Sequence, residues 1–161
     1  MPVFLSYYRL DEQKARAIHD RLTRIHGVST YIDVLDQEMR SASDVTGLIL
    51  SRLSSCTHIM ALLSSATVQS WWVPFEIGAA TQNERRIVSY NASYVSREDL
   101  PGYLKLWPIL RSIEDLDRFA HRYKQDRLPL EKSQRLTEAK AAAIQSANEF
   151  HRLLKFDISQ P

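Results

Sequence analysis

The chain is organised around residues 64–83, whose sequence is SSATVQSWWVPFEIGAATQN. The apolar run that leads into this stretch, residues 59–63, predicts a strand that feeds directly into a helix. Because Pro74 has no backbone N–H, it fits only the first turn of that helix. We therefore expect the helix to begin between residues 70 and 73, with Ser70 as its N-cap. Glu76 then lies in the second turn.

Glu76 is the leading candidate for a functional residue. It follows Trp72 by four positions, so the two side chains share one helix face. A carboxylate beside tandem tryptophans is costly to bury unless it meets water, a partner or a ligand. The junction between a strand and the following helix is also where open α/β sheets bind ligands. The competing interpretation is an ordinary acid on an exposed helix face, with both tryptophans in the core.

The rest of the chain alternates apolar runs with amphipathic stretches. The predicted strands are residues 2–6, 28–32, 57–63, 87–90 and 106–110. The other predicted helices of this unit are residues 11–25, 43–53 and 113–123. The expected buried stripes of the first and last of them are Ala15, Ile18, Leu22 and Ile25, and Ile113, Leu116, Phe119 and Ala120. Strands that alternate with helices predict an α/β fold: a flavodoxin-like, five-stranded parallel sheet with helices on both faces.

The residue types in two of the predicted strands indicate where each strand lies in the sheet. Residues 57–63 are apolar nearly throughout, which is typical of a central strand covered on both faces. Residues 106–110 contain Pro108, which suits an edge strand because proline cannot donate a ladder hydrogen bond. A loop of about a dozen residues, with a turn at Pro101-Gly102, is predicted ahead of that edge strand.

A last helix, residues 131–155, follows the predicted sheet unit. Its apolar stripe consists of Leu136, Ala143, Ala147, Phe150 and Leu154. We interpret residues 1–125 as the principal domain and residues 126–161 as a helical extension that packs on this domain or on a partner subunit. If the stripe lacks room on its own sheet, the protein is expected to be a homo-oligomer.

Composition excludes several classes of function. The net charge of the 161 residues is +2, which is too mild to predict a nucleic-acid partner. The sequence contains no signal peptide and no apolar run long enough for a membrane span. Its single cysteine, Cys56, cannot form an internal disulfide, which favours a reducing, cytoplasmic location. The five histidines lack metal-ligand spacing, and the four glycines form neither a dinucleotide-binding fingerprint nor a P-loop, so no metal site and no phosphate loop is predicted.

Polar and aromatic side chains follow the first two predicted strands. Ser6, Tyr7, Tyr8 and Arg9 lie at the end of the first strand, and Asp33 follows the second. In a parallel sheet the carboxyl ends of the strands share one edge with the start of the Glu76 helix. One edge therefore gathers a carboxylate, hydroxyls, aromatic rings and an arginine.

Two motifs resemble those of the Toll/interleukin-1 receptor (TIR) domain family. The segment Phe4-Leu-Ser-Tyr7, followed by Asp11, is similar to the family's first motif. The pattern Ser70-x-Trp72-x-x-x-Glu76 resembles its Ser-x-Trp-x-x-x-Glu motif, whose glutamate is catalytic in members that consume NAD. The order of elements over residues 1–125 agrees as well. The compact form resembles bacterial antiphage TIR proteins of the Thoeris type. The Arg-Asp-x-x-Pro-Gly loop of receptor members is replaced by residues 33–42.

The resemblance implies an NAD hydrolase or cyclase that cleaves the nicotinamide–ribose bond. The product would be an ADP-ribose-derived messenger, linear or cyclic, that activates a separate effector protein in antiphage defence. NAD would be the substrate, and no cofactor is expected. Glu76 would stabilise the ribose cation, Trp72 and Tyr7 or Tyr8 would stack on a base, and Arg9 would bind the pyrophosphate. Ser6 and Asp33 complete the expected substrate-binding set.

Two alternatives from other classes stay open. One is a non-catalytic TIR scaffold for protein interaction, in which Glu76 only caps or pairs. The other is an enzyme similar to nucleoside deoxyribosyltransferases, which also combine a flavodoxin-like sheet with a glutamate at an anomeric carbon.

Overall fold

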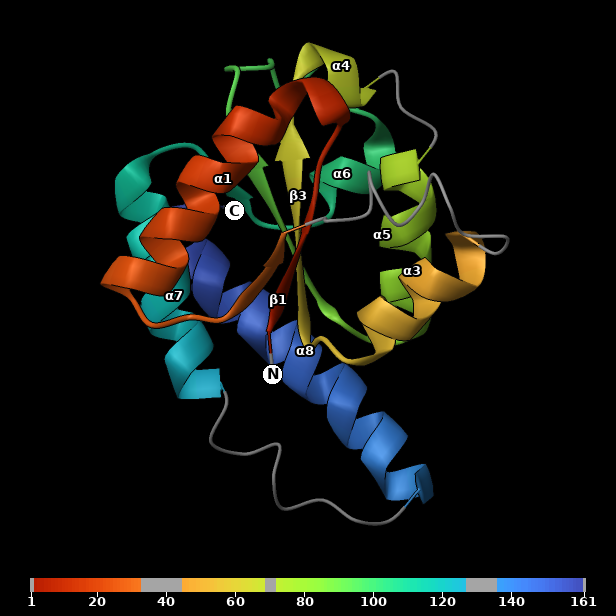
Figure 1. The fold of residues 1–161 in the computed structure, drawn as a ribbon. Helices are drawn as coiled ribbons and strands as arrows, with labels where there is room; N and C mark the ends of the chain where they lie inside the picture. Colours follow the sequence, from red (N-terminus) through yellow and green to blue (C-terminus); the bar gives the residue numbers. More distant parts are fainter. Residues whose placement is uncertain (1, 33–44, 69–71, 127–135, 161) are drawn as a thin grey trace.

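The computed structural model describes residues 2–32, 45–68, 72–126 and 136–160. Its strands form one sheet in the order β2–β1–β3–β4–β5, and every neighbouring pair is parallel (Figure 1). The strands are β1 (Val3–Ser6), β2 (Thr30–Ile32), β3 (His58–Leu63), β4 (Arg86–Asn91) and β5 (Ile109–Leu110). This order is flavodoxin-like, and β3 is central, so the predicted fold class is confirmed.

Helices cover both faces of the sheet. On one side lie α1 (Glu12–Asp20) and α7 (Ile113–Asp126), and on the other lie α3 (Val45–Ser54) and α5 (Trp72–Gln82) (Figure 1). The remaining helical segments are η1 (Arg9–Asp11), η2 (Arg21–Ile25), α4 (Ser65–Val68), α6 (Gly102–Lys105) and α8 (Leu136–Asp157). Within the described part of the chain, no helix combines the length and the apolar character that crossing a membrane requires.

The alternation of side chains along the strands divides the core into two clusters. Met60 and Leu62 of β3 join the cluster beneath α1 and α7. Ile59 and Leu63 join the cluster beneath α3 and α5. All six residues of β3 are buried, as the apolar run predicts for a strand covered on both faces.

The position of α5 confirms the role assigned to Pro74. The helix begins at Trp72, within the predicted window, and Pro74 is its third residue. At that place the missing N–H would have no intrahelical partner in any case. Glu76 lies in the second turn, as predicted.

The first predicted helix is less regular than its apolar spacing indicates. Residues 9–25 form a 3-10 turn, an α-helix and a π-helical turn in succession. Leu22 is fully buried, but Ile25 is 63% exposed, so Ile25 was wrongly placed on the buried stripe. A π-turn contains more residues per turn, so the side chain of Ile25, its last residue, is rotated off the buried face. Gly27 ends the segment with a φ of 63°, a conformation that favours glycine.

Three other predictions need correction. Ile113 is 44% exposed because it is the first residue of α7, whereas Leu116, Phe119 and Ala120 are buried as predicted. The predicted Pro101-Gly102 turn instead starts α6, which buries Leu104. The edge strand is confined to Ile109–Leu110, immediately after Pro108, whose carbonyl oxygen accepts a hydrogen bond from the Ser89 N–H at 2.9 Å.

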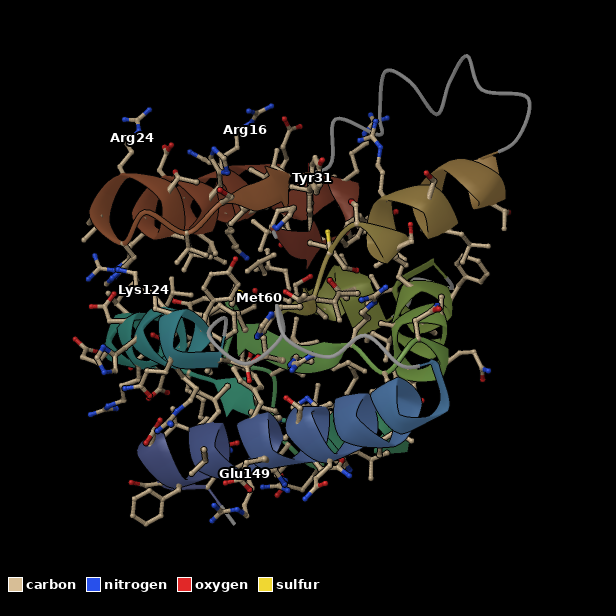
Figure 2. The ribbon with its side chains drawn as sticks, turned by 90° about the horizontal axis from the view of Figure 1, so that it is seen from below. Arg16, Arg24, Tyr31, Met60, Lys124 and Glu149 are labelled. Atoms are coloured by element: carbon tan, nitrogen blue, oxygen red, sulfur yellow. The ribbon has the colours of Figure 1, made fainter. Side chains whose placement is uncertain are left out.

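Helix α8 crosses the β4 and β5 side of the sheet (Figure 2). Phe150, Leu154 and Ile158 join the core cluster beneath α1 and α7. The side chain of Gln160 donates to the carbonyl oxygen of Ile109 and accepts from its N–H, which covers the free edge of β5. The described part of the apolar stripe is therefore occupied within the chain and gives no reason to expect a homo-oligomer. The predicted boundary at residue 125 stays a prediction.

A buried charged cluster joins α8 to the amino ends of β3 and β4. Arg86 Nε lies 2.8 Å from Asp126 Oδ2, and an Arg86 terminal nitrogen donates to Ser146 Oγ at 2.6 Å. His58 lies 3.7 Å from the same carboxylate oxygen and packs edge-on against surrounding aromatic rings. His151 Nε2 accepts a hydrogen bond from the Ile87 N–H at 2.8 Å.

The two histidines of this cluster predict a loss of stability in mild acid. Burial, and then the positive charge of Arg86, lowers the pKa of His151 from 6.5 to about 4 and that of His58 well below 6.5. A group whose pKa is lower in the folded protein than in the unfolded chain contributes stability at a pH above its unfolded-state pKa. That stability is lost as the pH falls toward its folded-state pKa. From pH 7 to pH 5, His151 alone should remove about 2 kcal/mol from the free energy of unfolding. Urea denaturation at the two pH values measures this loss, and His151→Gln should reduce it. An identical pH dependence in that variant contradicts the assignment.

Candidate functional site

Glu76 and Ser6 meet at the carboxyl edge of the sheet. Ser6 is the last residue of β1 and points to the same face as Phe4, toward α5. Its hydroxyl donates a hydrogen bond to Glu76 Oε2, and both residues are 2% exposed. The period of two along β1 and the second-turn position in α5 together bring these side chains into contact.

The burial of Glu76 decides between two interpretations of this residue. An acid on an exposed helix face is excluded, because only 2% of the residue is accessible. A buried carboxylate is costly unless polar groups stabilise it, and Ser6 supplies one such group. Removal from bulk water also strengthens the action of its negative charge on a neighbouring cation.

A second carboxylate, Asp11, lies at the same edge and was missing from the predicted site. It is 4% exposed, accepts a hydrogen bond from the hydroxyl of Ser64 just after β3, and lies 3.2 Å from Lys14 Nζ. Ser64 Oγ also accepts from the Thr67 N–H at 3.2 Å, which ties α4 to this edge. The sequence signal was present, because Asp11 belongs to the first TIR-like motif. Its serine partner is 53 residues away in the chain and cannot be found from local spacing.

The other predicted site residues fall into three groups. Tyr7 is half-buried against the core cluster beneath α1, while Tyr8 and Arg9 are exposed at the start of the following 3-10 turn. Trp72 begins α5, and its side chain lies outside the described residues. Asp33 also lies outside them. The structure therefore brings Ser6 and Glu76 together and places Tyr7, Tyr8 and Arg9 after the same strand end.

The described residues offer no alternative chemistry at this edge from metals or thiols. Among them, no three histidine, cysteine, aspartate or glutamate side chains are grouped as a metal ion would need. Cys56 is buried near the amino end of β3, and desolvation raises the pKa of its thiol to about 11. Such a thiol is not a nucleophile near neutral pH.

Comparisons with known proteins agree with the fold. A family model for the TIR domain matches residues 3–128, which include all the described strands and, of the described helices, all but α8. A Bacillus cereus (strain MSX-D12) protein, named "Probable 3' cyclic ADP-D-ribose synthase ThsB'", is 26% identical over 117 residues. The match covers 66% of this chain and 58% of that protein, so the chain spans less than two thirds of the relative's length.

Proposed function

The chain belongs to the TIR domain family, and from this premise we propose that it cleaves NAD at the bond between nicotinamide and ribose. The observation that carries the proposal is the buried Glu76 carboxylate, held by Ser6 at the carboxyl edge of the sheet. Ligands bind at this edge in open α/β folds. The Bacillus cereus relative is named as a probable cyclic ADP-ribose synthase, which supports the same chemistry.

The proposed reaction needs a carboxylate but no general acid. When the C–N bond breaks, its electron pair moves to the positively charged pyridinium nitrogen, and nicotinamide leaves as a neutral molecule. The ribose carbon then carries the developing positive charge. Glu76 is proposed to stabilise that charge electrostatically. Most glycosidases differ because their leaving group must be protonated by a second carboxyl group.

Ser6 is proposed as a positioning residue for Glu76. Its hydroxyl is held by burial in β1 and donates to the carboxylate, so it restrains the rotamer of Glu76. Arg9 is exposed at the same strand end and is the candidate donor to the pyrophosphate. Tyr7, Tyr8 and Trp72 are the candidate stacking residues, and Asp33 is a further candidate contact to the substrate.

The cation has two fates, which give different products. Attack by water yields linear ADP-ribose, whereas attack by a nucleophile of the same ADP-ribose molecule closes a ring. We favour cyclisation because the relative is named for a cyclic product. We further propose that the product activates a separate effector protein in antiphage defence and that the reaction needs no cofactor. A cytoplasmic location is proposed on the basis of the single cysteine.

One incubation separates this proposal from its alternatives. The protein is mixed with NAD and, separately, with a deoxynucleoside, and the products are resolved by chromatography. Free nicotinamide in the first mixture is the expected result. Release of a free base from the deoxynucleoside alone selects the deoxyribosyltransferase-like enzyme. No turnover in either mixture, with or without an extract of phage-infected cells, contradicts catalysis and selects the scaffold.

A further inference from the structure

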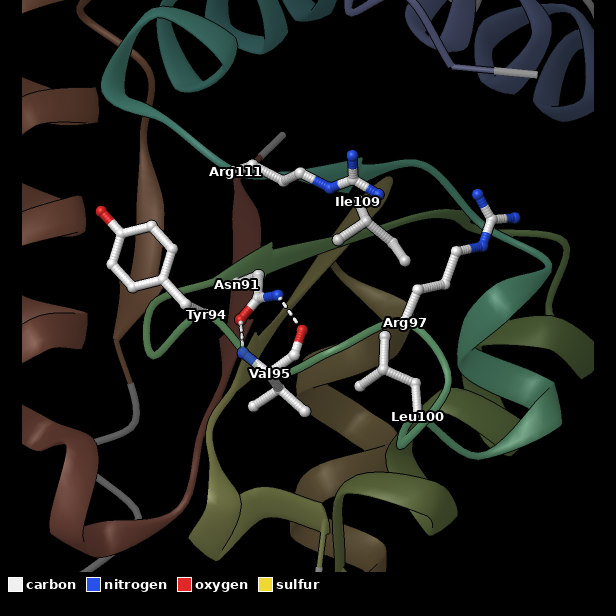
Figure 3. A pocket seen from close by; sticks show the side chains of 7 residues that line it. All are labelled: Asn91, Tyr94, Val95, Arg97, Leu100, Ile109 and Arg111. Atoms are coloured by element: carbon white, nitrogen blue, oxygen red, sulfur yellow. Dashed lines mark hydrogen bonds between the residues drawn. The ribbon is translucent and has the colours of Figure 1, made fainter.

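Two adjoining cavities lie at the carboxyl ends of β4 and β5. The first, about 210 Å³, is lined by Arg97 and Arg111 together with Asn91, Tyr94, Leu100 and Ile109, and we call it the arginine cavity (Figure 3). The second, about 220 Å³, has an apolar wall formed by Ala17, Ile18, Ile113 and Leu116, and we call it the apolar cavity. Asn91, Tyr94 and Arg111 line both, so the two cavities adjoin at these residues.

The arginine cavity carries the positive charges of Arg97 and Arg111. Neither cavity has an acidic side chain among its lining residues. Within the part of the chain that the structure describes, the guanidinium groups of Arg97 and Arg111 have no ion pair and no hydrogen bond. By contrast, Arg21 in the apolar cavity is paired in a bidentate manner with Asp117. Guanidinium groups without a protein partner, such as those of Arg97 and Arg111, can each donate two hydrogen bonds to a phosphate group.

Tyr94, which lines both cavities, has an unfavourable backbone conformation. Tyr94 has a φ of 53° and is 88% exposed. A non-glycine residue is sterically disfavoured in this left-handed region, and the exposed ring gains no free energy from burial that would offset the cost. Residues in such conformations persist where their surroundings impose them, and they concentrate at ligand sites.

Two contacts impose the conformation of this loop. The Asn91 side chain accepts from the Val95 N–H at 2.9 Å and donates to the Val95 carbonyl oxygen at 2.7 Å, which closes the turn that carries Tyr94 (Figure 3). Lys14 of α1 donates to Ser93 Oγ at 2.7 Å and lies 3.2 Å from Asp11. Hydrogen bonds therefore hold the loop of residues 91–95 both internally and against α1.

We propose that these cavities bind a nucleoside monophosphate. Its phosphate lies between Arg97 and Arg111, and its base enters the apolar cavity against the ring of Tyr94. A phosphate alone would not need the apolar wall or the exposed tyrosine, and an apolar ligand would not need two unpaired arginines. Asn91 ends β4 and Ser6 ends β1, two ladder spacings or roughly 10 Å away along the same edge of the sheet.

Calorimetric titration of the intact chain with AMP, adenosine and inorganic phosphate tests the assignment. AMP is expected to bind, and adenosine and phosphate are each expected to bind more weakly. Arg111→Gln and Arg97→Gln should each weaken AMP binding by roughly tenfold, because each removes a charge-assisted contact. Arg24→Gln is the matched control: it removes an exposed arginine of η2 outside both cavities and should leave AMP affinity unchanged.

Tyr94→Gly separates a binding role from a structural one. Glycine adopts a positive φ without strain, so the melting temperature should not fall. Loss of the stacking ring should weaken AMP binding by roughly fivefold or more.

The proposal is overturned if wild type does not bind AMP, or if AMP binds the Arg97 and Arg111 variants as tightly as wild type. Phosphate binding equal to that of AMP, with no effect of Tyr94→Gly, overturns the nucleoside assignment. Loss of AMP binding only in Arg9→Gln would place the nucleotide at the end of β1 and also overturn it.

Discussion

Replacing Glu76 with glutamine is expected to slow the release of nicotinamide from NAD by roughly 10²–10³-fold. Glutamine keeps the shape of the side chain and can still accept the hydrogen bond from Ser6, but it removes the negative charge. Glu76 is only 2% exposed, so in the proposed reaction its negative charge would act on the ribose cation with less screening than at the surface. The measurement is the initial rate of nicotinamide formation, with melting temperatures recorded alongside.

The matched control for this variant is Glu149→Gln. Glu149 is exposed on α8, paired with Arg152, and outside the TIR-like part of the chain. The same loss of one charge there should change neither the rate nor the melting temperature appreciably. A Glu76→Gln variant that folds normally and releases nicotinamide at the wild-type rate would show that Glu76 is not catalytic.

Asp126→Ala is expected to lower the free energy of unfolding by about 3–5 kcal/mol. The change leaves the buried guanidinium of Arg86 without its carboxylate, and the side chain of Arg86 is only 3% exposed. Burial raises the pKa of Asp126 even though Arg86 opposes the shift, which shows that desolvation of this pair is substantial. Urea denaturation at pH 7 gives the loss directly.

A double variant tests the reason for that loss. Arg86→Met combined with Asp126→Leu removes both charges and fills the space with apolar side chains, so it should be far more stable than Asp126→Ala alone. If the double variant loses as much stability as the single one, the penalty comes from packing or from the lost contact with Ser146 rather than from an unpaired charge.

The arrangement of the fold could be predicted because it depends on local regularities. Continuous apolar runs identified β3 as the central strand, and the placement of Pro74 fixed the start of α5 within a four-residue window. Predictions failed where one turn departs from the average helix. Ile25 is off the buried stripe because it lies in a π-turn, and residues 102–105 form α6 where the sequence indicated only a turn.

The candidate site was predictable only in part. The position of Glu76 at the carboxyl edge follows from the strand–helix order, and Ser6 follows from its place at the end of β1. The sequence could not show that Ser6 donates to Glu76, nor that Asp11 meets Ser64, because these partners lie 70 and 53 residues apart. The periodicity of apolar residues predicts which face of a strand or helix a side chain occupies. It does not predict which side chain, remote in sequence, that side chain contacts.

The sequence by itself therefore determined the parallel sheet, its central strand and the edge at which Glu76 lies, because periods of two and 3.6 residues and a single proline act locally. Tertiary structure alone decided that Glu76 is buried rather than exposed, that Arg86 and Asp126 pair beneath α8, and that Tyr94 is held at a positive φ beside two unpaired arginines. Each of these depends on how strands and helices remote in sequence close around a polar group, and the energy of that group is set by its neighbours and by the water that they exclude.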